Sequence, residues 1–232
     1  MFEFFSNFGS IDWTAVFKII GIDIMLGADN AVVIALACAA LPLLMRNRAM
    51  LWGTAGAIAI RAVALAAAGL LLGITAVKII AGVYLLYVGY QLLMDHDEET
   101  NVESADGILA AIKTIIVADF MMSIDNVMAI AAAAQSVGPH ATLYAIAGVI
   151  FSIPVIVFAA KYLTVLMDKF PIIIWCGAGL LGWVGAEMII TDTLFTQYVH
   201  ISTEWAYKAA GFAAVILAVI ATRHFSKTNS QI

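Results

Sequence analysis

Charged side chains are scarce in this chain, and their scarcity decides its class. Only 12% of the 232 residues are Asp, Glu, Lys or Arg, whereas 64% are hydrophobic. A soluble domain carries roughly 25% charged residues, so a soluble globular protein is excluded. The net charge of −5 argues against a nucleic-acid partner. The composition instead predicts a multi-pass membrane protein whose main partner is the lipid bilayer.

Cysteine and histidine are almost missing from the apolar stretches. Two cysteines cannot build a disulfide framework. No Cys-x2-Cys or His-x3-His pattern occurs in an apolar stretch, and the four histidines fall in the connections or the tail. Zinc and copper sites use imidazole or thiolate ligands. Neither metal is expected here, and no permanently bound cofactor is predicted.

The hydrophobic runs predict an all-α bundle of seven transmembrane helices in a single domain, residues 1–232. A helix needs about 20 apolar residues to cross the hydrocarbon core. The predicted spans are Trp13–Cys38, Met50–Leu72, Thr75–Met94, Ile108–Ala134, Ala141–Ala160, Ile172–Ile190 and Trp205–Thr222. Pro154 lies inside the fifth span, where it is expected to kink the helix or free a carbonyl.

The distribution of Lys and Arg predicts the orientation. With the N-terminus outside, seven of the 11 basic residues face the cytoplasm: Arg46, Arg48, Lys113, Lys161, Lys169, Arg223 and Lys227. Cytoplasmic loops of membrane proteins carry such an excess. We therefore expect a bacterial plasma-membrane protein with its N-terminus outside and its C-terminus in the cytoplasm.

An internal duplication indicates how the spans are arranged. Ile19–Cys38 aligns without a gap with Ile115–Ala134, and nine of the twenty positions are identical. The copies are repeat 1, about residues 11–94, and repeat 2, about 108–190, followed by a seventh helix at about 205–222. Because each copy holds three spans, the second enters the membrane from the opposite side, as in many secondary transporters. The acidic segment 95–107 between them is either a solvated linker or a cation-sensing patch.

Five carboxylates lie inside the predicted spans, where a charge facing lipid costs several kcal/mol. They are Asp23, Asp29, Asp119, Asp125 and Glu187. Arg61 is the only basic residue deep in a span, and we expect it to be their internal counter-charge. One arginine cannot neutralise five acids, so the others are protonated or bind a cation. Glu187 is expected to face Gln91 across the repeat and to accept protons.

Helix geometry arranges these acids on two faces. Asp23 and Asn30 are separated by two turns and share one face, while Met25 and Asp29, four residues apart, share another. The second copy repeats this pattern with Asp119 and Asn126, and with Met121 and Asp125. Gly27 or Ser123, which precede the Asp-Asn pairs, are expected to allow local unwinding of the helix.

The residue types favour a hard or borderline divalent cation as the substrate. Carboxylate and amide oxygens suit magnesium, calcium or manganese. Met25 and Met121 are either flexible filler of the core or thioether ligands, and a thioether ligand favours manganese over calcium. We expect Asp29, Asn30, Asp125 and Asn126 to be the ligands, with Asp23 and Asp119 as second-site or gate carboxylates.

The paired motifs resemble those of a known family. Asp23-x5-Asp29-Asn30 and Ser123-Ile124-Asp125-Asn126 are similar to the duplicated Asp-Asn motifs of the TerC integral membrane family, and the similarity covers nearly the whole chain. That family was named for tellurium resistance, and members have been linked to manganese export from the cytoplasm. The resemblance implies a manganese exporter with Asp23, Asp29, Asp119 and Asp125 as its transport site.

Two other functions compete with transport. Paired intramembrane aspartates occur in aspartyl proteases, but the Gly-x-Gly-Asp string of those enzymes is missing here, so no enzyme is predicted. The remaining alternative is a non-transporting membrane partner, such as an assembly or insertion factor or a tellurite-resistance component, in which the carboxylates are structural. For an exporter, the residues fit both a uniporter and an exchange against protons.

Overall fold

The computed structural model describes residues 13–66, 76–95, 105–135, 141–199 and 203–229. Every regular element in these ranges is an α-helix, which confirms the predicted all-α class. The helices are α2 (Trp13–Leu26), α3 (Ala28–Ala39), α4 (Leu43–Ala66), α6 (Val77–Asp95), α7 (Ala105–Gln135), α8 (Ala141–Lys169), α9 (Ile172–Ile190), α10 (Thr193–Tyr198) and α11 (Glu204–Asn229).

Among the residues described, five helices contain stretches long and apolar enough to cross a membrane. These stretches are Val77–Asp95, Asp106–Ile124, Phe151–Lys169, Ile172–Ile190 and Glu204–His224. The predicted sixth span coincides with α9 at both ends. The predicted second span, Met50–Leu72, begins within α4 and ends outside the described residues. α8 continues as a helix through Pro154 and ends at Lys169, later than predicted.

The predicted first span is two helices rather than one. α2 has 14 residues and α3 has 12, so neither crosses a membrane alone. They meet at Gly27, whose φ of −100° and ψ of 6° leave the helical range, while its N–H still donates to the Asp23 carbonyl at 2.8 Å. The expected unwinding at Gly27 is therefore limited to one residue. At the corresponding Ser123 the expectation is wrong, because α7 is continuous there.

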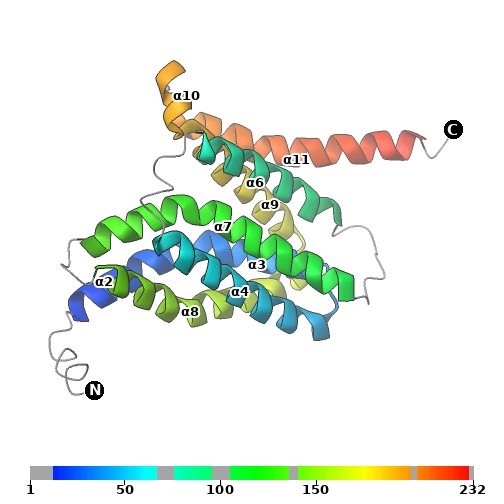
Figure 1. Ribbon diagram of the computed structural model, residues 1–232. Coiled ribbons are helices and arrows are strands. Elements are labelled where there is room, and N and C mark those ends of the chain that lie inside the picture. The colour runs from blue at the N-terminus through cyan, green and yellow to red at the C-terminus, as the bar shows by residue number, and fades with distance from the viewer. Residues whose placement is uncertain (1–12, 67–75, 96–104, 136–140, 200–202, 230–232) are drawn as a thin grey trace.

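The helices form two layers (Figure 1). One layer holds α2, α3, α4, α7 and α8, in which α4 packs on α7 while α2 and α3 pack on α8. The other holds α6, α9 and α11, each in contact with the other two. Contacts of α6 with α7 and of α3 with α9 join the layers. In the first layer, α3 and α7 are therefore the helices that face the second layer.

Glycines allow the helices of the second layer to approach closely. A Cβ on Gly82 of α6 would lie 2.3 Å from the carbonyl oxygen of Gly185 of α9, and one on Gly182 would lie 2.3 Å from that of Gly211 in α11. Membrane helices associate through such small-residue contacts, because lipid provides no hydrophobic drive for their association. α11, which belongs to neither sequence copy, is thus packed tightly onto α9.

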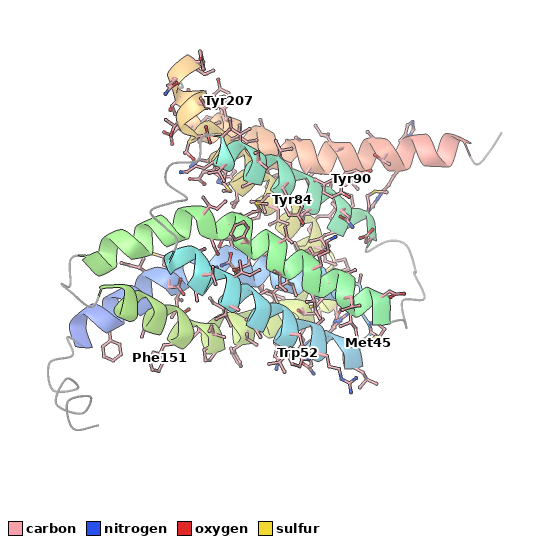
Figure 2. The ribbon with its side chains drawn as sticks, viewed as in Figure 1. Met45, Trp52, Tyr84, Tyr90, Phe151 and Tyr207 are labelled. Atoms are coloured by element: carbon pink, nitrogen blue, oxygen red, sulfur yellow. The ribbon has the colours of Figure 1, made fainter. Side chains whose placement is uncertain are left out.

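The outer surface of the bundle is apolar. Trp52 of α4 is 65% exposed and Phe151 of α8 is 61% exposed, and both side chains point away from the bundle (Figure 2). Soluble monomers rarely expose so many large apolar side chains. It fits a protein surrounded by lipid.

Arginine side chains close one end of the bundle. Arg46 donates to the carbonyl oxygen of Ala39, the last residue of α3, at 2.8 Å and to that of Leu41, just beyond this helix, at 2.7 Å. It also donates to Asp168 of α8 at 2.6 Å. Arg223 of α11 donates to the Leu93 carbonyl of α6 at 3.1 Å. These cations satisfy carbonyl groups that helix ends leave without intrahelical partners.

Candidate metal-transport site

The motif aspartates of the two sequence copies meet at one arginine. Arg61 of α4 donates through Nη1 to Asp23 of α2 at 3.4 Å and through Nη2 to Asp119 of α7 at 2.8 Å. The exposed fractions are 0% for Asp23, 4% for Arg61 and 7% for Asp119. The expectation that Arg61 is an internal counter-charge is confirmed. One guanidinium balances only one of the two carboxylates if both are ionised.

Each aspartate also accepts a hydrogen bond from a serine. Ser123 Oγ donates to Asp119 Oδ2 at 3.2 Å and accepts from Arg61 Nε at 2.9 Å. Ser152 Oγ of α8 donates to Asp23 Oδ2. The two acids therefore have matching surroundings, each with one arginine nitrogen and one serine hydroxyl. The hydroxyl of Ser123 thus bonds to a side chain one turn earlier on α7, which is continuous at this point.

Two buried polar side chains beside this cluster have no hydrogen-bond partner. Asn30 of α3 is 1% exposed, and both its Oδ1 and its Nδ2 are unpaired; Thr54 Oγ1 is the other unpaired group. A Cβ placed on Gly27 would lie 2.8 Å from the Asp23 carbonyl oxygen and 3.6 Å from Asn30 Nδ2. The neighbouring atoms therefore leave no room for a side chain at position 27. Buried polar groups without partners are rare, and they are available here for a ligand.

A larger cavity of about 660 Å³ lies on the other face of α2 and α3. The carboxylates of Asp29 and Glu187 line it together with three thioethers, those of Met25, Met122 and Met188. The carboxylate of Asp29 accepts from the Asn30 N–H at 2.9 Å in the first turn of α3, where the helix dipole favours a negative charge. In the first copy the predicted division into two faces is confirmed, because Asp23 and Asn30 are buried whereas Met25 and Asp29 line the cavity.

Glu187 does not have the predicted neighbour. Its Oε1 accepts from Lys208 Nζ of α11 at 2.6 Å, while Gln91 donates to Asp95 at 3.5 Å. α6 and α9 run antiparallel, since Gly82 lies against Gly185 and Gly89 against Ala178. Gln91 is therefore level with the opposite end of α9. Equivalent positions of two antiparallel helices lie at opposite ends of the helix pair. The predicted contact between Glu187 and Gln91 is therefore wrong.

The remaining predicted ligands are placed only in part. Asp125 and Asn126 belong to α7, but their side chains lie outside the described residues. Met121 is packed against the hydrophobic core, and its neighbour Met122 lines the large cavity instead. Within the described part of the chain, no three His, Cys, Asp or Glu side chains come together in a group that could hold a metal.

The structure adds residues that the sequence analysis did not assign to a site. Ser152 and Thr54 lie against the acid cluster, and Lys78 and Met188 line the large cavity. Ser152 lies in the Ser-Ile-Pro string of the fifth span, where its polarity inside an apolar run was a usable signal. Thr54 gives the same signal inside the predicted second span, whereas the positions of Lys78 and Met188 at the cavity depend on helix packing.

Comparison with known proteins identifies relatives of the chain. The sequence profile of the integral membrane protein TerC family matches residues 8–231. Membrane protein YjbE of Bacillus subtilis (strain 168) is 39% identical over 204 residues, which are 87% of this chain and 92% of YjbE. Membrane protein YkoY of the same organism is 27% identical over 188 residues, 74% of this chain and 58% of YkoY. No solved structure matches the chain.

Proposed function

The chain belongs to the integral membrane protein TerC family, and from that membership and its buried acidic cluster we propose that it exports a divalent cation, manganese above all, from the cytoplasm. The observation that carries the proposal is the meeting of Asp23 and Asp119 at Arg61, beside the unpaired amide of Asn30. Ionisable residues inside the membrane typically mark an ion pathway. Their surplus of negative charge suits a cation.

The proposed pathway connects the cavity on one face of α2 and α3 with the acid cluster on the other face. The 660 Å³ cavity leads to Asp29, and Asp29 directly precedes Asn30, which lies on the face of the buried acids. On export the cation binds the oxygen atoms of Asp23, Asp119 and Asn30 first, then passes Asp29 and leaves through the cavity. Asp125 and Asn126 remain in the proposed ligand set on the basis of the sequence duplication.

The choice of manganese rests on the ligand chemistry. Oxygen ligands suit magnesium, calcium and manganese, but the cavity at Asp29 also carries the thioethers of Met25, Met122 and Met188. A thioether is a softer ligand that magnesium and calcium do not use. Manganese is the cation of this group that tolerates both.

An inverted repeat with its N-terminus outside is part of the proposal. The contacts support a two-fold relation between the copies, because α4 packs on α7 as α2 and α3 pack on α8, while the outside N-terminus rests on the distribution of Lys and Arg. In this orientation the end closed by Arg46 and Arg223 faces the cytoplasm. The cavity at Asp29 opens near Lys78 and Thr191, and therefore toward the outside.

A non-transporting membrane partner is the second candidate, and one observation favours it. The carboxylates of Asp23 and Asp119 are satisfied by Arg61, Ser123 and Ser152, as in a structural network. In such a protein, removing one acid destabilises the bundle without altering metal flux.

Export from intact cells separates the two candidates. Cells producing the protein are loaded with excess manganese, and their metal content is followed by elemental analysis. Asp29→Asn keeps shape and hydrogen-bonding capacity while removing one charge. We expect normal amounts in the membrane but no lowering of cellular manganese. Asp168→Asn is the matched control, because this acid pairs with Arg46 at the end of the bundle and is 40% exposed. Wild-type export by Asp29→Asn would favour the membrane partner.

A further inference from the structure

Arg61 lies where the proposed cargo has to bind. Its guanidinium contacts Asp23 of the first copy and Asp119 of the second. A cation bound to both acids would stand within a few ångströms of this positive charge. Two cations that close repel strongly in a poorly polarisable interior, so the guanidinium has to withdraw when the ion arrives.

A small cavity beside Arg61 offers a place for that withdrawal. It measures about 20 Å³ and is lined by Arg61, Thr54 and Asp119 together with Ser152 and apolar side chains. This volume accommodates about one water-sized group. One amino group of the guanidinium can therefore move into it without rearrangement of the helices.

Thr54 provides a second hydrogen-bonding position for the arginine. Thr54 is 6% exposed and its Oγ1 has no hydrogen-bond partner. Thr54 precedes Arg61 on α4 by about two turns, so both side chains project from the same face of the helix. An arginine N–H turned toward the cavity would be accepted by this hydroxyl, which otherwise remains buried and unpaired at a cost.

Asn30 offers the ion a ligand that the arginine does not use. Its amide is buried and unpaired in the present arrangement, in which the guanidinium neutralises the acids. An ion at the acids would gain the Asn30 oxygen as a ligand, whereas the guanidinium does not bond to it. The cluster thus has a ligand atom that its resident arginine leaves unused.

We propose that Arg61 is a tethered cation that occupies the site when the divalent ion is absent and moves to Thr54 when the ion binds. This inference rests on the proposed function and assigns Arg61 a positioning role within it. The arginine keeps the empty site paired, so the carrier can return without a cargo ion. The same competition weakens ion binding, because only the fraction of molecules with Arg61 withdrawn is competent to bind.

Equilibrium binding of Mn²⁺ to the purified protein in detergent tests the proposal. Free Mn²⁺ is measured by electron paramagnetic resonance in mildly alkaline buffer, where protons compete least for carboxylates. Arg61→Gln removes the competing charge but keeps an amide donor, and we expect it to bind Mn²⁺ roughly tenfold more tightly. A merely structural arginine would give equal or weaker binding. Arg46→Gln, at the end of the bundle, is the control expected to match the wild type.

Thr54→Val tests the second position with the opposite sign. The substitution preserves shape and removes a hydroxyl that has no partner, so the variant should fold. Without this acceptor the guanidinium stays on the acids, and we expect Mn²⁺ binding weaker by a few fold. This variant decides the matter if Arg61→Gln does not fold, since unchanged binding in Thr54→Val would overturn the proposal.

These binding measurements distinguish a failure of the tethered-arginine inference from a failure of the proposed function. A wild-type protein that neither binds nor moves Mn²⁺ would refute the proposed function and the inference with it. Wild-type binding that is lost in Asp29→Asn but unaltered in both Arg61→Gln and Thr54→Val would leave the function standing and refute the tethered arginine alone.

Discussion

Replacing Arg61 by methionine should destabilise the bundle more than any other single change in the acid cluster. The side chain is 4% exposed and donates to Asp23, Asp119 and Ser123. Methionine fills the space but leaves two carboxylates without a cation. Breaking a buried ion pair from one side costs about 3–5 kcal/mol. For a chain of this length that corresponds to a fall in Tm of roughly 6–20 °C.

Removal of one acid should restore part of this loss. In Asp119→Asn the remaining Arg61 and Asp23 form a balanced pair, so we expect a cost below about 2 kcal/mol. The double variant carries one unpaired carboxylate instead of two. It should be more stable than Arg61→Met alone, with a coupling of about 0.5–3 kcal/mol. Thermal unfolding of the purified proteins in one detergent, followed by tryptophan fluorescence, measures all four corners of this cycle.

Additive effects would refute the reasoning. If the double variant loses the sum of the two single losses, Arg61 and Asp119 act independently and the ion pair contributes nothing. A wild-type Tm in Arg61→Met would show that the arginine is surrounded by water rather than by the acids.

Two further predictions concern the packing around the site. Gly82→Val should lower the Tm, because a Cβ 2.3 Å from the Gly185 carbonyl oxygen forces α6 away from α9 at a cost of about 1–3 kcal/mol or more. Gly21→Ala is the control, since a Cβ at Gly21 would have nothing within 4 Å. Equal Tm values for the two variants would contradict the close approach of α6 and α9. Arg46→Ala should lower the free energy of unfolding by about 1–2 kcal/mol, mainly because Arg46 no longer bonds to the helix-end carbonyls. The ion pair with Asp168 contributes less, since that acid is 40% exposed. A loss abolished by high salt would instead assign the effect to the ion pair.

Much of the acid cluster follows from the sequence because burying a charge in lipid is so costly. Arg61 is the one cation deep in a predicted span, so its contact with Asp23 and Asp119 required only that helices pack with polar groups inward. The separation of Asp23 and Asn30 from Met25 and Asp29 follows from the period of the helix alone. These are local or charge-driven features, and no detailed packing was needed to predict them.

Other features depend on packing that sequence patterns do not encode. Gly27 marked a place for local unwinding in the first span, but only its backbone geometry shows that α2 ends there. Glu187 was paired with Gln91 because their positions correspond in the duplication, although antiparallel helices place such positions far apart. Thr54 became part of the site only because α4 lies against α7 and α8.

Flux through the purified protein in proteoliposomes tests the central claim most directly. Vesicles are loaded with a manganese-sensitive dye, and manganese, magnesium, calcium and zinc are added separately. We expect manganese entry above that of protein-free vesicles, no zinc entry, loss of manganese entry in Asp29→Asn and its retention in Asp168→Asn. Absence of flux for all four cations in the wild type, or equal flux in Asp29→Asn, would contradict the central claim.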